Sequence, residues 1–175
     1  MNFKFKNKSG FTLIEMLFAM AIFIIVIGVY MSIFVSTTRM HAKIIAIQKV
    51  QNEIRYVTET LSSNIRMGTI NYDYYDEETT SNPKAVLALI DNAGGTIFYK
   101  AEGGTFKTSN DTLSWTDISY GNVYFNRMDF YITDDTQHPG VMFFIDAKYT
   151  NNQASLEKDI RFVLQNFVSS RQYKQ

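Results

Sequence analysis

The chain has no cysteine among its 175 residues, which excludes a disulfide framework and a cysteine nucleophile. Any folded domain must therefore be stabilised by its hydrophobic core alone. The aromatic content of 15%, with 14 Phe and 11 Tyr, is sufficient for one modest core. The length is compatible with one small domain and one additional segment.

Sequence motifs of the common enzyme classes are also missing. The chain has no G-x-S-x-G nucleophile motif, no P-loop and no H-E-x-x-H zinc motif. The two histidines, His41 and His138, are far apart in the sequence and are interpreted as solvated surface residues. The sequence therefore predicts neither an enzyme nor a cofactor site.

Clustered acidic residues are weak candidates for a calcium site. They are Asp73, Asp76, Glu77 and Glu78, with a second group of Asp129, Asp134 and Asp135. Hard oxygen ligands on a flexible loop suit Ca²⁺, but the alternating acid spacing and fixed glycine of an EF-hand are missing. Solvated acidic side chains are therefore the favoured interpretation.

The charge balance gives little support for nucleic-acid binding. The chain carries 17 basic and 17 acidic residues, and three of the basic ones, Lys4, Lys6 and Lys8, lie within the first ten positions. Residues 11–175 therefore have 14 basic and 17 acidic groups, a formal charge of −3. General nucleic-acid binding requires a basic surface instead, so no specific nucleic-acid partner is expected.

A long uncharged segment, Met16–Val35, follows a single carboxylate, Glu15. Its length corresponds to about 30 Å of helix, the thickness of the hydrocarbon core of a bilayer. In a cleaved secretory signal the apolar region precedes the cut, whereas here the small pair Ser9-Gly10 precedes the apolar region and Val35–Thr38 is a poor cleavage site. A lipoprotein signal would require a cysteine. The segment predicts a membrane anchor that stays on the mature protein.

The sequence Gly10–Leu17, GFTLIEML, resembles the processing site of type IV prepilins and pseudopilins. That family has a glycine, then Phe or Met, then Thr-Leu-Ile-Glu and an unbroken apolar helix, after a short basic leader. The resemblance covers about the first 35 residues. It implies cleavage by a prepilin peptidase between Gly10 and Phe11, N-methylation of Phe11, and a leader whose charges are Lys4, Lys6 and Lys8.

The same resemblance gives Glu15 a role, which is to pair with the Phe11 ammonium of a neighbouring subunit during filament assembly. A carboxylate at bilayer depth costs about 2.5–3.5 kcal/mol. The twelve Leu, Ile, Phe and Val residues of Met16–Val35 contribute roughly −4 to −7 kcal/mol in total, so insertion tolerates the charge. The alternative is a solvated acid at the helix start, favoured by the helix macrodipole. The proline that many family members carry in the apolar segment is missing, and Gly28 is its only weak point.

Beyond the apolar segment, hydrophobic residues continue at helical spacing, which indicates one buried stripe. They are Met40, Ile44, Ile47, Val50, Ile54, Val57, Leu61 and Ile65. Neither proline nor glycine occurs between Val29 and Met67, so one helix of about 85 Å is expected from about Phe11 to Met67. A coiled coil would show the same stripe and remains an alternative.

After Gly68 and a polar, acidic connection, the hydrophobic period changes to two, which is typical of strands. A hairpin is expected from Ala85–Ile90 and Thr96–Lys100, then a turn at Glu102–Gly104, then short strands near Phe106 and Leu113–Trp115. Longer strands are expected at Val123–Thr133, Val141–Thr150 and Leu156–Val168. Short connections between them, at 134–140 and 151–154, favour antiparallel neighbours. Tyr72, Tyr74 and Tyr75 are expected to fold back onto the sheet.

An antiparallel sheet with one apolar face requires a cover, which the helix stripe can supply. The predicted fold class is therefore α+β, a long N-terminal helix packed on an antiparallel sheet, which is also the fold that the pilin resemblance implies. The expected domains are a leader at 1–10, a membrane or filament-core helix at 11–35, an amphipathic helix at 36–67, an acidic loop at 68–83 and a β-domain at 84–175.

The function that the resemblance implies is that of a minor prepilin or pseudopilin of a type IV pilus or a type II secretion-like system. Ile54–Arg66 and Phe167–Arg171 resemble the J-type minor pseudopilins more loosely. A major pilin, or a single-span protein whose exported β-domain binds a ligand, are the alternatives. The implied partners are other subunits, the peptidase, the membrane assembly platform and, before assembly, lipid. The implied location is the inner membrane, with the leader cytoplasmic and the β-domain outside, and then the filament.

Overall fold

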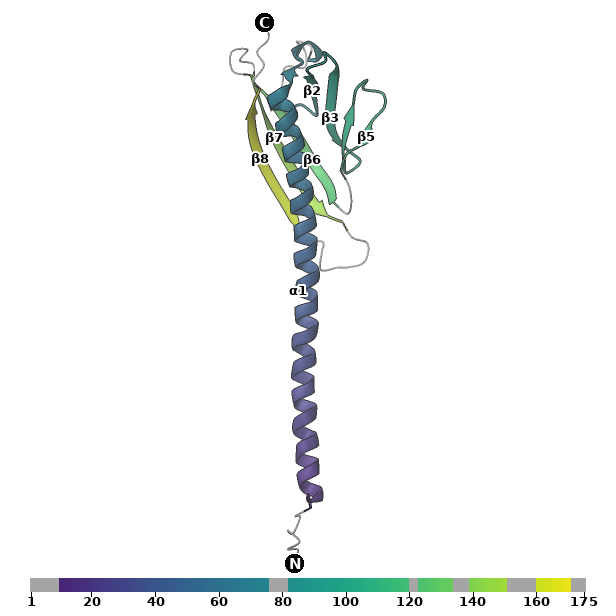
Figure 1. Ribbon diagram of the computed structural model, residues 1–175, viewed down its shortest axis with the longest axis vertical. Coiled ribbons are helices and arrows are strands. Elements are labelled where there is room, and N and C mark those ends of the chain that lie inside the picture. The colour runs from purple at the N-terminus through teal and green to yellow at the C-terminus, as the bar shows by residue number, and fades with distance from the viewer. Residues whose placement is uncertain (1–9, 76–81, 120–122, 134–138, 151–159, 171–175) are drawn as a thin grey trace, which may run out of the picture. The chain divides into compact units, whose positions relative to one another are not determined.

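The computed structural model describes residues 10–75, 82–119, 123–133, 139–150 and 160–170. The chain divides into two compact units, Met1–Ala42 and Lys43–Gln175. We refer to them as the N-terminal unit and the C-terminal unit. One helix, α1, extends from Leu13 to Met67 and contributes to both (Figure 1).

In the N-terminal unit, every described residue is exposed. The helix there is uncharged from Met16 to Thr38 and continues through Gly28 without interruption. This agrees with the absence of proline from the segment, because proline is the usual cause of a break in a helix.

In the C-terminal unit, α1 buries one stripe of apolar side chains. The buried residues are Ala46, Val50, Ile54, Val57, Leu61 and Ile65. The predicted stripe also included Met40 and Ile44, which was wrong, because they are 62% and 44% exposed. Ile47 is partly buried against the core. Helical spacing shows which residues share a face, but it does not show whether another element covers that face.

The strands form two antiparallel sheets. The first has the order β1-β2-β3-β4-β5, with β1 at Thr69–Ile70, β2 at Val86–Ile90, β3 at Thr96–Glu102, β4 at Thr105–Ser109 and β5 at Thr116–Asp117. The second has the order β6-β7-β8, with β6 at Val123–Ile132, β7 at Gly140–Tyr149 and β8 at Arg161–Ser169. The predicted α+β class, the first hairpin and the strands at Val123–Thr133 and Val141–Thr150 are confirmed. The strand predicted at Leu156–Val168 is confirmed from Arg161 onwards, and residues 156–159 lie outside the described residues. The division into two sheets was not predicted, because it depends on contacts distant in the sequence.

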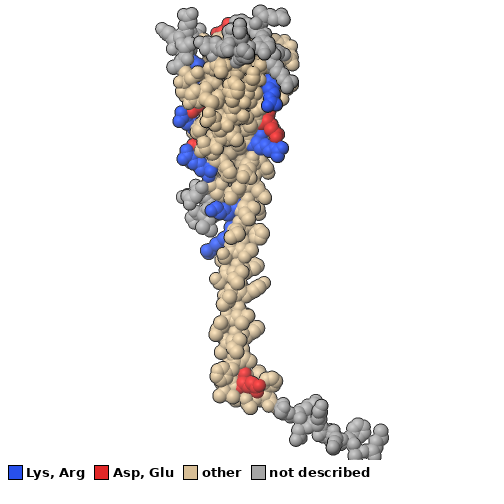
Figure 2. Space-filling view, turned by 90° about the vertical axis from the view of Figure 1, so that its left-hand side faces the viewer, with Lys and Arg blue, Asp and Glu red and all other residues tan. Residues whose placement is uncertain are grey.

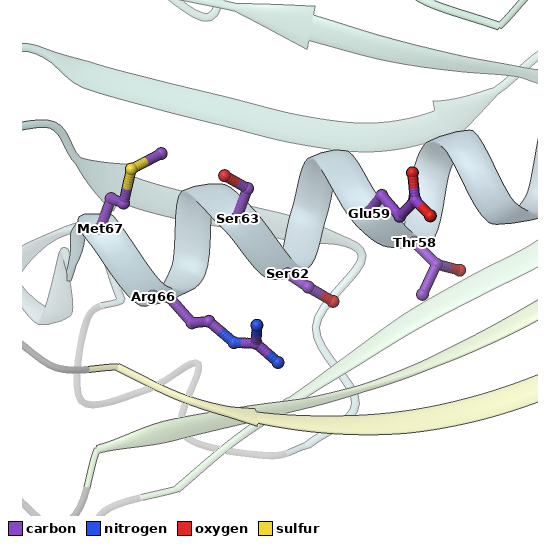
Figure 3. A pocket seen from close by; sticks show the side chains of 6 residues that line it. All are labelled: Thr58, Glu59, Ser62, Ser63, Arg66 and Met67. Carbon is purple, nitrogen blue, oxygen red and sulfur yellow. The ribbon is translucent and has the colours of Figure 1, made fainter.

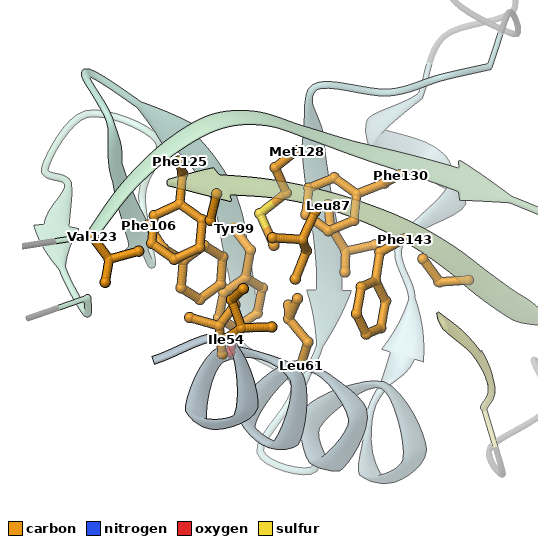
Figure 4. Packing of buried hydrophobic residues seen from close by; sticks show 14 of the residues in the cluster. Ile54, Leu61, Leu87, Tyr99, Phe106, Val123, Phe125, Met128, Phe130 and Phe143 are labelled. Carbon is orange, nitrogen blue, oxygen red and sulfur yellow. The ribbon is translucent and has the colours of Figure 1, made fainter. Parts of the chain in front are cut away.

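The two sheets and α1 enclose one core. In Figure 4, Ile54 and Leu61 of the helix face Leu87, Tyr99 and Phe106 of the first sheet and several side chains of the second. In β7 the predicted period of two is confirmed for the core face, because Val141, Phe143, Ile145, Ala147 and Tyr149 are all buried. Asp146 of the opposite face is buried as well, where it binds Arg161. Phe162 and Leu164 of β8 pack partly buried against the same core.

The strand predicted at Leu113–Trp115 was wrong. These residues form a loop held by Asp111, whose Oδ1 accepts hydrogen bonds from the backbone N–H groups of Leu113 (3.0 Å) and Ser114 (2.8 Å). Thr112 has a positive φ of 63°, which is incompatible with a strand. Side-chain to backbone bonds of this kind compete with strand pairing, and the short β5 begins only at Thr116.

Beyond the helix end, the tyrosines fold back onto the strands, as predicted. A short 3₁₀-helix, η1, lies at Tyr72–Tyr74. The Tyr72 hydroxyl donates to the Thr133 carbonyl (3.1 Å), and the Tyr75 hydroxyl donates to the Val86 carbonyl (3.2 Å). Burial raises the pKa of Tyr75 above its usual value.

Gly68 ends the helix where two backbone segments come close. A Cβ added there would lie 2.8 Å from the Ile90 carbonyl oxygen and 2.9 Å from that of Asn64. Its own carbonyl accepts a hydrogen bond from the buried Ser170 hydroxyl (2.7 Å). The site therefore joins the helix end to β2 and to the residue after β8.

We expect Gly68→Ala to lower the free energy of unfolding of the C-terminal unit by about 1–3 kcal/mol, because the backbone must shift to admit the methyl group. Urea unfolding of the full chain in detergent, followed by fluorescence of its single tryptophan, measures this change. Gly95→Ala is the matched control, since an added Cβ there meets only ordinary contacts of 3.5 Å with Asp91. Equal unfolding midpoints for both variants would contradict the steric explanation.

Candidate processing and assembly site

The start of α1 is a capped helix end. Thr12 precedes the first helical residue, its Oγ1 accepts a hydrogen bond from the Glu15 backbone N–H (3.4 Å), and its carbonyl accepts one from the Met16 N–H (3.2 Å). Threonine is a preferred N-cap residue because its oxygen satisfies a backbone donor that the helix leaves free. Thr12 therefore fixes where the helix begins, two residues after Gly10.

Thr12 and Glu15 also have the spacing of a capping box, in which Ser or Thr at the N-cap is followed three residues later by Glu or Gln. The bond to the threonine oxygen is present. A carboxylate in the first turn is favoured by the partial positive charge of the helix N-terminus. The sequence prediction missed this role of Thr12, although T-x-x-E was its signal.

Gly10 and Phe11 lie just before this cap, and both are exposed to solvent. Phe11 is 76% exposed, and no heavy atom lies within 4 Å of a Cβ built on Gly10. Gly10 has no positive φ, in contrast to Gly94, Gly103 and Gly104. This fold therefore places no demand for glycine at position 10, so a requirement for glycine there would come from another molecule that binds the segment.

Apolar side chains cover the helix after Glu15, and among the described residues nothing packs on those of the N-terminal unit. Figure 2 shows this surface as uncharged, with one acidic patch near the start of the helix. An exposed apolar surface of this extent is typical of membrane or protein contacts. The helix is long and apolar enough to span a membrane, by length and composition.

Residues 5–31 match the prokaryotic N-terminal methylation motif. The match supports a type IV prepilin-like protein, and its motif implies processing by a peptidase and assembly with other pilin subunits. The prepilin-like segment and the apolar helix together suggest a single-pass membrane anchor. No curated protein and no solved structure matches the chain.

Of the other predicted site residues, only some lie in the part of the chain that the structure describes. Asp73 lies in η1 and Asp129 forms an ion pair with Arg127, while Asp76, Glu77, Glu78, Asp134 and Asp135 lie outside the described residues. His41 is exposed on α1, and His138 and the leader lysines Lys4, Lys6 and Lys8 are also outside that part. Within the described ranges, no three His, Asp or Glu side chains are grouped so as to hold a metal ion.

A hollow on the outer side of α1 is lined by polar side chains (Figure 3). They are Thr58, Glu59, Ser62, Ser63 and Arg66, with Met67 at one end. Glu59 forms an ion pair with Arg55 (2.7 Å), and both side chains are mostly exposed, so the pair contributes little to stability. The hollow is open, and its residues form no recognisable catalytic arrangement.

Proposed function

We propose that the chain is a minor prepilin or pseudopilin, a structural subunit rather than an enzyme. Assembled into a type IV pilus or a type II secretion-like pseudopilus, or initiating one, it would contribute its apolar helix to the filament core. The observation that carries this proposal is the methylation motif at residues 5–31, directly before a helix segment that no described part of the chain covers.

The functional residues that we propose lie within the segment that the motif matches. Gly10 and Phe11 flank the cleavage site, Phe11 is N-methylated after cleavage, and Glu15 pairs with the Phe11 ammonium of a neighbouring subunit. Residues 1–10 are the leader, 11–35 the membrane and filament-core helix, 36–67 the amphipathic helix, 68–83 the connecting loop and 84–175 the β-domain. The loose likeness of Ile54–Arg66 to J-type minor pseudopilins favours a minor role.

The experiment that tests the proposal is quantitative mass spectrometry of filaments or crosslinked filament complexes from the native host. We expect the chain to be present with other pilin-like proteins and at much lower abundance than the main one. An abundance equal to that of the main subunit would indicate a major pilin. Absence from every such complex would favour a single-span anchor that does not polymerise.

Topology gives a second prediction, in which the C-terminal unit lies outside the cytoplasmic membrane. The leader carries Lys4, Lys6 and Lys8, while Arg39, Lys43 and Lys49 follow the apolar segment, so the positive-inside rule favours this orientation only slightly. We expect protease added to spheroplasts to degrade the C-terminal unit. Protection of that unit, while a periplasmic control protein is cut, would contradict the orientation.

A further inference from the structure

The two sheets have four edges, of which two end in very short strands and a third is bound by other parts of the chain. The first sheet ends in β1 and β5, which are only two residues each. Very short edge strands offer little backbone for another strand to pair with, which is one of the ways in which proteins avoid edge-to-edge association.

The outer edge of β6 is closed by other parts of the chain. The Phe125 N–H donates to the Gly104 carbonyl (2.9 Å), and Phe130 exchanges two backbone bonds with Lys84 (2.7 and 2.9 Å). The Ile132 N–H donates to Asn82 Oδ1 and its carbonyl accepts from Asn82 Nδ2, both at 3.2 Å. Three residues that β6 directs away from β7, namely Phe125, Phe130 and Ile132, thus have backbone partners on this edge.

The outer edge of β8 is different. The Tyr149 N–H donates to the Ile160 carbonyl (3.0 Å), which shows that this odd-numbered residue of β7 directs its backbone groups towards β8. Every other residue of β7 does the same, and the residues of β8 that lie opposite them are even-numbered. In an antiparallel pair the alternate residues point away. In β8 these are Arg161, Val163, Gln165, Phe167 and Ser169, and within the described part of the chain none of their outward N–H groups has a partner.

The usual protections of an edge strand are also absent from β8. It has no proline, and its register with β7 is continuous from Arg161 to Ser169, without a bulge. Its one charged residue, Arg161, is held by Asp146 through two bonds of 2.7 Å, which keep the pKa of that carboxyl below its usual range. Val163 and Phe167 are each 55% exposed. The edge is long and regular, and it carries two exposed apolar side chains.

A groove follows this edge on the side of the core. It lies between α1 and β8 and is lined by Phe162, Val163 and Leu164 of the strand together with Gln51, Ile54, Arg55, Thr58 and Glu59 of the helix. Figure 1 shows β8 as the outer strand of its sheet. A strand added to β8 would satisfy the outward backbone groups and cover this groove, which is the geometry of β-strand addition.

We propose that the occupant is β8 of a second copy of this chain, paired antiparallel about a two-fold axis at Gln165. In this register the outward-pointing residues of the two strands face one another, as hydrogen bonding requires. Val163 lies opposite Phe167, Arg161 lies opposite Ser169, and Gln165 lies opposite itself. The two exposed apolar residues therefore cover each other, and no like charges meet.

The contact involves only residues of the C-terminal unit, so it does not depend on the placement of the N-terminal unit or on the proposed function. A two-fold interface uses the same patch on both copies. Neighbours in one filament share a single orientation, whereas this pairing reverses the strand. It therefore describes an association between copies that is separate from filament assembly.

Cysteine crosslinking tests the register, because the natural chain has no cysteine. Hydrogen-bonded antiparallel partners have Cα atoms about 5.5 Å apart, within the range of a disulfide. We expect Gln165→Cys, in the detergent-solubilised full chain, where copies are free to reverse their orientation, to form a disulfide dimer on mild oxidation. Val163→Cys alone should not, since four strand residues, about 13 Å, separate it from its own copy. Val163→Cys mixed with Phe167→Cys should crosslink.

Charge at the axis gives an independent test. Gln165→Lys alone and Gln165→Glu alone each place like charges opposite one another, and each should weaken dimerisation of the detergent-solubilised chain up to about fivefold. Mixing the two variants should restore it as a heterodimer in sedimentation experiments. Unchanged unfolding midpoints show that the variants are folded. A wild-type chain that stays monomeric, or Val163→Cys crosslinking as well as Gln165→Cys, would overturn the proposal.

Discussion

The Gly10→Val variant is expected to retain its leader, while the wild-type chain from its own host begins at N-methyl-Phe11. The peptidase subsite for residue 10 is proposed to have no room for a side chain. Forcing extra carbon atoms into a closely packed site costs about 1–3 kcal/mol, which corresponds to a cleavage rate about five- to 150-fold lower. Mass spectrometry of the membrane-extracted protein distinguishes the two N-termini.

The described fold does not require a glycine at position 10, so a loss of cleavage in Gly10→Val would be due to the peptidase and not to misfolding. No atom lies within 4 Å of an added Cβ at Gly10, and the same is true of Gly28. Gly28→Val is therefore the matched control, and it should be cleaved and methylated normally. A wild-type protein that keeps residues 1–10 in its native host would contradict the prepilin-like interpretation.

Replacing Glu15 with leucine should leave cleavage and membrane insertion intact but remove the chain from filaments. Loss of the carboxylate makes insertion easier, because a charge at bilayer depth is costly. If the carboxylate pairs with a neighbour's Phe11 ammonium, the same change leaves a buried cation without its partner. Breaking a buried pair costs about 3–5 kcal/mol, so incorporation should fall by about two orders of magnitude or more.

Glu15→Gln separates this effect from helix capping. Glutamine can occupy the same position of a capping box, so the helix start that Thr12 fixes is preserved while the charge is lost. We expect Glu15→Gln to assemble nearly as poorly as Glu15→Leu in crosslinking with partner subunits. Assembly of both variants at the wild-type level would show that Glu15 acts only as an acid at the helix start, and would favour a passive anchor.

Much of the fold could be predicted because its periodic segments are long. Leu61, Ile65 and the alternating residues of β7 are buried as their spacing indicates. The exposure of Met40 and the division into two sheets were not predicted, for the same reason. Both depend on which distant segment packs against a given face of a helix or strand. The loop at Leu113–Trp115 was missed because Asp111 binds its backbone locally, a bond that hydrophobic spacing does not reveal.

The candidate site was easier to predict than the surface of the C-terminal unit. Gly10, Phe11 and Glu15 are close in sequence, so one local motif predicts them together, and residues 5–31 match the N-terminal methylation motif. Their roles in processing and assembly stay predictions. The open edge of β8 has no local signal. It depends on Asn82 and Lys84, which bind the outer edge of β6, while no described segment pairs with the outer edge of β8. Such contacts are visible only in the folded chain.

The bond from Ser170 to Gly68 has a consequence for the order of events during biosynthesis. It joins residues 102 positions apart, and β8, which ends just before Ser170, completes the second sheet. Because synthesis proceeds from the N-terminus, α1 and most strands leave the ribosome before the strand that finishes their core. Until then the edge of β7 that pairs with β8 is open beside apolar side chains. The nascent chain is thus exposed to aggregation and proteolysis until β8 has left the ribosome and paired with β7.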